Sequence, residues 1–378
     1  MTAVSAREVA RWLVSAAMSM RAEPSAGFAV GAGCNTVWAG GTPQSSTALR
    51  AGSLPTLPAV ITSDARAIDP HALARALHGD ATMTAACPLL VELCAGTAAL
   101  SLRLHAGRKA RPPVSRMGNK AGYADVILRV LGLRPGQGHT DGTRYLWCEP
   151  DAGVRLLLHA YTDRELATAA ADIIRSWKDE DPRALWERLR AEGPATCPEG
   201  LTAREVARLL TIMRWAYANV PIGHNGEHFT IPANGPNSPL TFGANNFGST
   251  LTTARGLSRA PTLPATIHPD ARALPAPTLP PGTVAYMDGP YENTTSYAHL
   301  FPRAEQVEVA RRWDAAGATV CISEAEPIPE LVADGWHKVE ITGERKGQRR
   351  TFSKQQREWL TMNRAPSWTP SVQGSLFG

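Results

Sequence analysis

Closely spaced cysteines are absent from this 378-residue chain. Zinc knuckles and redox dithiols need cysteine pairs a few residues apart, so the spacing argues against both kinds of site. Because most of the cysteines fall in or beside apolar runs, we expect reduced thiols in a cytosolic protein. The cysteines are Cys34, Cys87, Cys94, Cys148, Cys197 and Cys321.

Long uninterrupted apolar runs are also lacking. The most apolar window, residues 84–102, contains Glu92 and Gly96, so we expect a strand that leads into a helix and no membrane span. The first residues lack a basic region followed by an apolar stretch, so no secretory signal is expected. A hydrophobic content of 43% excludes a mainly disordered chain, and the length predicts two or three domains.

Basic residues are concentrated in one short segment. The whole chain has a net charge of +5, which only weakly suggests a polyanionic partner. Residues 344–364 alone hold seven basic and two acidic residues, a local charge of +5 (7 − 2). Such a cluster suits contacts with phosphate groups, and a solvated hairpin is the alternative. The candidate nucleic-acid contacts are Arg345, Lys346, Arg349, Arg350 and Lys354.

Two segments of the chain occur twice, in the same order. Residues 6–13 and 203–210 are identical at seven of eight positions, and residues 55–68 and 261–274 at ten of fourteen. Duplication of a segment of about seventy residues explains both matches. The N-terminal copy is interpreted as a structural remnant, and the alternatives are an extended binding surface or self-association.

Short apolar runs alternate with helical patterns from residue 88 onwards. Four runs predict buried parallel strands, at residues 88–93, 145–148, 283–287 and 319–322. Capping residues predict helices that begin near Ser5, Thr162, Asp181 and Thr202. The alternation predicts an open, doubly wound α/β sheet, in which ligands bind at the carboxyl ends of the strands.

Two predicted strand ends carry acidic residues beside small ones. VELCAGTAAL, residues 91–100, places Glu92 before a tight turn and a helix, one way to hold a nucleoside-bearing ligand. LWCEPDAG, residues 146–153, places Glu149 where Rossmann-type sheets bind ribose hydroxyls, while Asp151 is expected to cap the next helix. The alternatives are a turn without a ligand and a surface helix cap.

The most specific motif is YMDGPYENTTSY, residues 286–297. After an apolar strand it combines Asp288, a Gly-Pro turn, Tyr291 and a polar tail that ends in Tyr297. The run resembles the Asp-Pro-Pro-Tyr motif of DNA adenine methyltransferases, in particular the Dam-like family. A Gly-Pro turn without a catalytic role is the alternative.

Other segments between residues 88 and 364 are similar to the same family. Residues 92–98 resemble its cofactor loop, residues 148–151 its acidic turn after the second strand, and residues 117–120 its Gly-Gly-Lys element. Residues 358–360 follow its C-terminal pattern.

The chain departs from the family pattern at three places. Ala98 replaces the second glycine of the cofactor loop, and Gly289 replaces the first proline of the catalytic motif. The element that ends in Lys120 follows the cofactor loop instead of preceding it. Glycine keeps the backbone carbonyl that the family uses as an acceptor, but it loses the rigidity of proline.

The resemblance implies an α/β fold with a Rossmann-like methyltransferase sheet, helices on both faces and a smaller, loop-rich recognition domain. It implies S-adenosylmethionine as the cofactor and double-stranded DNA with a flipped adenine as the partner, without a metal. The implied catalytic residues are Asp288, Gly289, Pro290 and Tyr291, with Tyr291 stacking on the flipped base. The implied cofactor-binding residues are Glu92, Ala95, Gly96, Lys120, Glu149 and Asp288.

The resemblance also implies a division of the chain. Residues 81–194 and 281–364 are the cofactor-binding and catalytic halves, with target recognition at 195–280 between them. Residues 1–80 contain the duplicate and 365–378 a flexible tail. Two other functions stay open: methylation of the exocyclic amine of cytosine, whose enzymes more often have Ser in place of Asp288, and a catalytically weak fold kept as a DNA-binding module.

Overall fold

The computed structural model describes residues 87–114, 119–192, 202–215, 250–272, 274, 279–291, 299–342 and 357–370. All described residues belong to one compact unit of the chain, Asp64–Gly378. The N-terminal copy of the repeat, residues 6–68, therefore lies outside the described residues.

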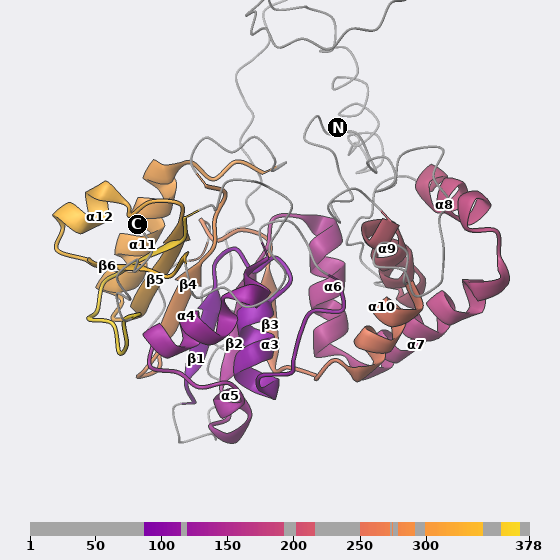
Figure 1. The fold of residues 1–378 in the computed structure, drawn as a ribbon, viewed down its shortest axis with the longest axis horizontal. Coiled ribbons are helices and arrows are strands. Elements are labelled where there is room, and N and C mark those ends of the chain that lie inside the picture. The colour runs from indigo at the N-terminus through magenta and orange to yellow at the C-terminus, as the bar shows by residue number, and fades with distance from the viewer. Residues whose placement is uncertain are drawn as a thin grey trace, which may run out of the picture. The chain divides into compact units, whose positions relative to one another are not determined.

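Seven strands form one sheet in the order β3-β2-β1-β4-β5-β7-β6 (Figure 1). Strands β1 to β5 pair in parallel, whereas β7 runs antiparallel to both β5 and β6. The strands are β1 (Leu89–Glu92), β2 (Arg144–Cys148), β3 (Ala265–His268), β4 (Val284–Met287), β5 (Thr319–Glu324), β6 (His337–Glu340) and β7 (Trp359–Met362). The four predicted strands are confirmed as β1, β2, β4 and β5.

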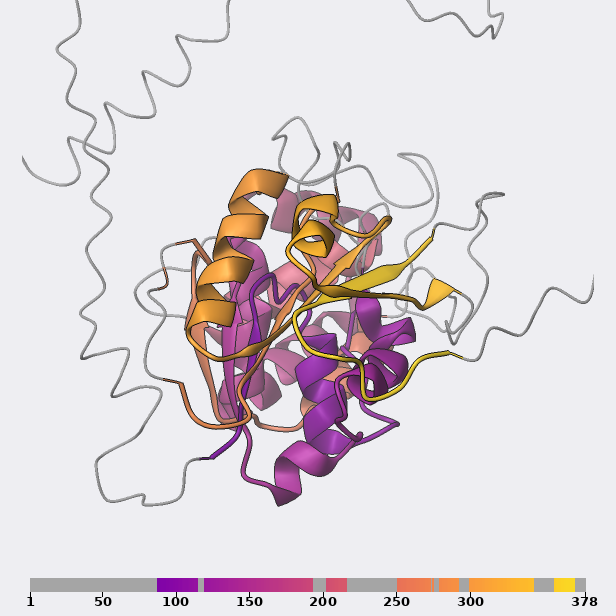
Figure 2. The ribbon, with the colours of Figure 1, turned by 90° about the vertical axis from the view of Figure 1, so that its left-hand side faces the viewer.

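Helices cover both faces of this sheet. Successive strand residues point to opposite faces, so Leu90 of β1 packs in one apolar cluster with α3 and α4, while Val91 packs in another with α11. Figure 2 shows α3 and α11 on opposite sides of the strands. The helices are α3 (Ala99–Ala106), α4 (Ala124–Val130), α5 (Gln137–Thr140), α6 (Ala152–Thr162), α7 (Arg164–Ser176), α8 (Pro182–Ala191), α9 (Ala203–Trp215), α10 (Thr250–Arg259), α11 (Arg303–Ala315) and α12 (Pro329–Ala333), with 3₁₀ turns at Lys120–Gly122 and Trp177–Asp179.

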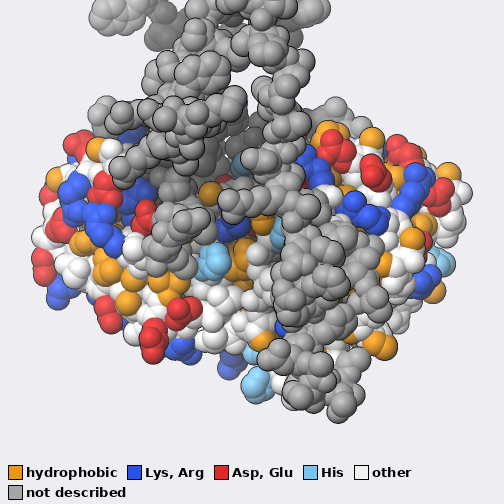
Figure 3. All heavy atoms as spheres, turned by 180° about the vertical axis from the view of Figure 1, so that it is seen from behind, with side chains coloured by type: hydrophobic (Ala, Val, Ile, Leu, Met, Phe, Trp, Pro, Cys, Tyr) orange, Lys and Arg blue, Asp and Glu red, His pale blue; other side chains and the backbone are white. Residues whose placement is uncertain are grey.

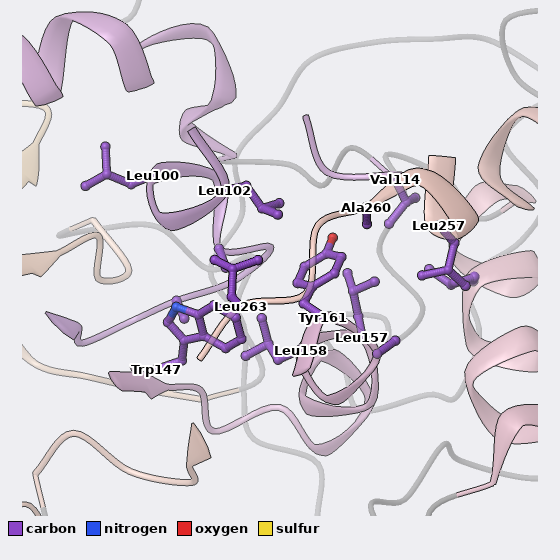
Figure 4. Packing of buried hydrophobic residues seen from close by; sticks show 14 of the residues in the cluster. Leu100, Leu102, Val114, Trp147, Leu157, Leu158, Tyr161, Leu257, Ala260 and Leu263 are labelled. Atoms are coloured by element: carbon purple, nitrogen blue, oxygen red, sulfur yellow. The ribbon is translucent and has the colours of Figure 1, made fainter. Parts of the chain in front are cut away.

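Helix α6 connects the sheet to the helices α7 to α10. It contacts β3 and α9, while α7 contacts α9 and α10. Trp147 of β2 and Tyr161 of α6 are both buried and meet edge to face with ring centroids 6.3 Å apart, and Figure 4 shows Leu158 and Leu263 beside them. Such an aromatic pair contributes about 0.5–1.5 kcal/mol beyond its burial. The packing fixes α6, whose first turn follows the acidic turn after β2.

The predicted helix starts are confirmed with one correction. Asp181 caps α8 by accepting from the N–H of Ala184, and Thr202 accepts from the third residue after it at the start of α9. The cap of α7 is Asp163 and not Thr162, because the Asp163 carboxylate accepts from two backbone N–H groups of the first turn. The predicted start near Ser5 lies outside the described residues.

Part of the predicted target-recognition region, 195–280, belongs to the sheet. Residues 265–268 are β3, which pairs in parallel with β2 and forms the edge of the sheet. The sequence ATIH has no continuous apolar run, so its pattern did not predict a buried strand. The predicted boundary at residue 280 therefore assigns one edge strand of the sheet to the recognition region.

The first part of the predicted flexible tail lies against α4. The backbone N–H of Ser367 donates to the carbonyl of Val130 over 2.9 Å. The guanidinium group of Arg129 lies 4.0 Å from the centroid of the Trp368 ring, a cation–π contact. Residues 371–378 of the tail lie outside the described residues.

Candidate functional site

Three acidic side chains lie at the carboxyl edge of the sheet. In the strand register, Glu92 at the end of β1 is opposite Trp147 of β2 and Tyr286 of β4. Glu149 comes two residues after Trp147, and Asp288 comes two residues after Tyr286, so the three acids lie at the same edge of the sheet. Ligands of open α/β sheets bind at this edge. All three acids line one cavity there.

The loop between β1 and α3 turns tightly beside these acids. The N–H of Ala95 donates to the carbonyl of Cys148 at the end of β2 over 2.8 Å. Gly96 and Ala98 both adopt left-handed backbone conformations, with φ of +51° and +50°. That conformation costs a residue with a Cβ atom about 1–2 kcal/mol. The chain therefore keeps the turn of a two-glycine loop although alanine stands at the second position.

Glu92 is held at the start of α3 by Ser101. Its Oε1 accepts from the backbone N–H of Ser101 over 2.9 Å and from the Ser101 hydroxyl. The Ser101 hydroxyl oxygen in turn accepts from the indole N–H of Trp147. Burial raises the pKa of Glu92 from its ordinary value of 4.5 to about 7, although the bonds from Ser101 oppose this, and the charge of Asp288 adds to the rise.

Glu149 connects the loop to the end of β2. One oxygen accepts from the N–H of Gly96 over 2.8 Å, and the other accepts from the N–H of Asp151 over 3.0 Å. Asp151 caps α6, as predicted, by accepting from two N–H groups of its first turn.

The cavity at this edge has a volume of about 980 Å³, including the part that is open to solvent. Gly289 and Tyr291 are the predicted catalytic and cofactor residues that do not line it, and Tyr291 is buried. The predicted residues that do line it are Glu92, Ala95, Gly96, Lys120, Glu149, Asp288 and Pro290.

Gly289 lies directly against Gln306 of α11. A Cβ atom at position 289 would be 2.8 Å from Oε1 and 2.9 Å from Cδ of Gln306. The Gln306 amide is itself fixed, because its Nε2 donates to the carbonyls of Pro290 and Phe301 over 3.1 and 2.8 Å. Gln306 thus fills the space that a proline ring at position 289 would need, which is a steric reason for the glycine.

Lys120 binds the predicted catalytic acid. Its Nζ lies 2.6 Å from Oδ1 of Asp288, 3.7 Å from Oε1 of Glu358 and 4.8 Å from the centroid of the Tyr291 ring. The side chains of Lys120 and Glu358 are both 7% exposed, and that of Asp288 is 19% exposed. Burial raises the pKa of both carboxyl groups, while Lys120 opposes the rise. Two carboxylates therefore share one ammonium group.

Several residues of the site were not predicted from the sequence. Asp270 and Arg272 follow β3, line the cavity and form an ion pair of 2.9 Å. Burial acts to raise the pKa of Asp270, but hydrogen bonds from Arg272 outweigh it and lower the pKa. The only signal for this pair was its place in the repeat, at residues 261–274. No sequence pattern identified Gln306 as a residue of the site, because a single glutamine in a helix is common.

The predicted nucleic-acid contacts are outside the described part of the chain. These are Arg345, Lys346, Arg349, Arg350 and Lys354, together with residues 216–249 of the recognition region and 292–298 of the catalytic tail. Among the described residues visible in Figure 3, Lys and Arg side chains are interspersed with Asp and Glu. Binding of DNA is therefore a prediction from the sequence alone.

The described residues were also searched for metal sites and membrane spans. They contain no group of three or more His, Cys, Asp or Glu side chains that could hold a metal ion. No helix among them is both long and apolar enough to cross a membrane. Within the same residues, Cys87, Cys94, Cys148 and Cys321 are free thiols.

Comparison with protein-family models gives no match, and no curated protein matches the chain. The functional proposal therefore depends on the residues of the cavity and on their geometry.

Proposed function

We propose that the chain is a DNA methyltransferase that uses S-adenosylmethionine and acts on the exocyclic amine of adenine. The observation that carries the proposal is that one cavity is lined both by residues 92–97, which resemble a cofactor loop, and by Asp288 and Pro290 of the catalytic motif. The strand order supports it. Antiparallel β7 is inserted between β5 and β6 of the doubly wound order 3-2-1-4-5-6, the order of Rossmann-type sheets that bind nucleoside-bearing ligands.

The chemistry of the cavity suits the cofactor. When bound, S-adenosylmethionine supplies an electrophilic methyl group on a positively charged sulfur. The charged residues that line the cavity are mainly acidic, which favours a cationic ligand. The acids are Glu92, Glu149, Asp151, Asp270 and Asp288, and the basic residues are Lys120 and Arg272; His299 also lines the cavity.

Glu149 and Asp270 are the residues best placed to bind the nucleoside part. Glu149 follows β2, the position at which acids bind ribose hydroxyls in Rossmann-type sheets. Asp270 follows the neighbouring strand β3, and its lowered pKa favours the ionised form, which only accepts hydrogen bonds. An ionised carboxylate at this place can accept from the amine of a purine.

Asp288 and the carbonyl of Gly289 would bind the amine of the target base. That amine is a poor nucleophile, because its lone pair is delocalised into the ring. Hydrogen bonds to two fixed acceptors localise the lone pair and orient it, so positioning and electrostatics supply most of the acceleration. Lys120 binds Oδ1 of Asp288, so the amine would bind Oδ2.

A base inside a duplex cannot reach these acceptors, so the target must be flipped out of the helix. Stacking on an aromatic side chain is worth about 1–3 kcal/mol per base. Tyr291 follows the catalytic turn directly and is the proposed stacking partner; because its ring is buried and does not line the cavity, stacking requires the turn to open. Its ring would offset part of the cost of unstacking the base.

Transfer of a labelled methyl group to DNA tests the proposal. The wild-type chain should label DNA, and Asp288→Asn should lower the rate by at least about 100-fold, the usual effect of losing one preorganised polar group. DNA binding should persist in this variant, because the substitution removes no phosphate contact. Asp179→Asn is the matched control, since its side chain is 86% exposed and lies outside the cavity.

The same assay separates the alternatives. Mass spectrometry of the nucleosides should find N6-methyladenine, whereas N4-methylcytosine would favour the cytosine enzyme. Tight DNA binding without transfer to any DNA would refute the enzyme and favour a binding module. Asp288 favours adenine, since cytosine enzymes more often have serine at this position.

A further inference from the structure

Glu358 is a buried acid beside the catalytic turn that the proposed chemistry does not use. It directly precedes β7, and 5% of the residue is exposed. Its backbone is fixed by the neighbouring strand: its carbonyl accepts from the N–H of Ile341 over 2.8 Å, and its N–H donates to the Thr342 hydroxyl over 2.9 Å. The carboxylate is thus attached to a rigid part of the sheet.

One oxygen of Glu358 contacts two residues of the site. Oε1 accepts from the Tyr291 hydroxyl over 2.6 Å and lies 3.7 Å from Nζ of Lys120. The same ammonium group is 2.6 Å from Asp288 and 4.8 Å from the centre of the Tyr291 ring. Asp288, Lys120, Glu358 and Tyr291 therefore form a closed cluster, in which Glu358 is the member from the far end of the chain.

The cluster restrains the two groups that the proposed reaction needs in place. A tyrosine ring that is held only at Cβ can rotate about χ1 and χ2, but a second attachment at its hydroxyl restricts both rotations. Hydrogen bonds to charged acceptors are about twice as strong as neutral ones. The Glu358 bond is charge-assisted whenever the carboxylate is ionised; burial raises the pKa of this carboxyl group, and Lys120 opposes the rise.

We propose that Glu358 is a positioning residue, which holds the ring of Tyr291 beside the catalytic turn and the ammonium group of Lys120 next to Asp288. This inference deepens the proposed function and rests on it. Glu358 acts through Tyr291 and Lys120, because it contacts both and does not itself line the cavity.

A double-mutant cycle between positions 358 and 291 tests the proposal. Glu358→Met keeps the length of the side chain but removes the acceptor, and Tyr291→Phe keeps the ring but removes the hydroxyl. Each should lower kcat/KM for duplex DNA by about tenfold, the effect of losing one charge-assisted hydrogen bond. The double variant should be no worse than Glu358→Met alone, because that substitution already removes the contact between the two side chains.

Two further measurements separate positioning from general damage. Glu358→Gln retains an acceptor for the hydroxyl and should keep kcat/KM within about threefold of the wild type, since a neutral hydrogen bond replaces a charged one. The affinity for S-adenosylmethionine should be unchanged in all three variants. With 2-aminopurine as the target base, Glu358→Met should alter the fluorescence of the extruded base.

The outcomes distinguish the two proposals. If the wild type transfers methyl groups but Glu358→Met matches it, or if the effects at 358 and 291 add, the positioning role is wrong and the proposed function stands. Equal loss of cofactor affinity and of thermal stability in Glu358→Met and Glu358→Gln would show a merely structural role. A wild-type chain that labels no DNA would overturn both proposals.

Discussion

Replacing Glu92 by glutamine should change how the stability of the protein depends on pH. Glu92 is 3% exposed and carries a pKa raised to about 7, against 4.5 for an ordinary glutamate. The folded state thus binds this proton more tightly than the unfolded state does. The free energy of unfolding therefore falls as the pH rises from 4.5 through 7.

The size of the effect follows from the two pKa values. They differ by about 2.5, which at about 1.36 kcal/mol for each pKa unit amounts to roughly 3 kcal/mol. Glutamine is never charged, and its carbonyl oxygen can still accept from the N–H and hydroxyl of Ser101. Relative to the wild type, Glu92→Gln should therefore become more stable by about 3 kcal/mol between pH 4.5 and pH 8.

Urea unfolding of both proteins at several pH values measures this difference. Subtracting the free energy of unfolding of the wild type from that of the variant cancels the pH dependence of all titratable groups that the two proteins share. Glu187→Gln is the matched control, because Glu187 is exposed on α8. Parallel stability curves for Glu92→Gln and the wild type would show that burial does not raise the pKa of this carboxyl group, and the prediction would be wrong.

Two substitutions test other parts of the site by denaturant unfolding. Lys120→Met should lower the free energy of unfolding by about 3–5 kcal/mol at neutral pH, because Asp288 and Glu358 lose the cation that they share. The loss should be smaller at acidic pH, where these carboxyl groups become protonated. An equal loss at all pH values would contradict this explanation. Gly289→Ala should cost about 1–3 kcal/mol, because its Cβ requires Gln306 to move. Adding Gln306→Ala should make that second cost smaller, and full additivity would refute the steric explanation.

Local patterns predicted most of the sheet and of its motifs. The four apolar runs were confirmed as β1, β2, β4 and β5, because strands buried on both faces have continuous apolar sequences. Glu92, Glu149 and Asp288 were predicted to lie at the carboxyl ends of the strands, and they line one cavity there. These positions follow from the rule that parallel strands end at the same edge.

Edge strands and caps were less predictable. The edge strand β3 is only partly buried along its length, so its sequence ATIH carries little apolar signal. The α7 cap was predicted one residue early, since Thr162 and Asp163 are both good caps and only the backbone geometry selects between them. Pairing with β2 makes residues 265–268 a strand, and the packing of α7 determines that its cap is Asp163.

The sequence by itself determined the order of strands and helices along the chain and the acids at the strand ends, because periodicity and capping act over a few residues. Only the tertiary structure decided which distant side chains meet. Glu358 accepts a hydrogen bond from Tyr291, which is 67 residues away in the sequence. Lys120 reaches Asp288 because β1, which precedes Lys120 in the chain, lies beside β4, which ends directly before Asp288. Such contacts depend on the pairing of β1 with β4 and of β5 with β7, which no local pattern specifies.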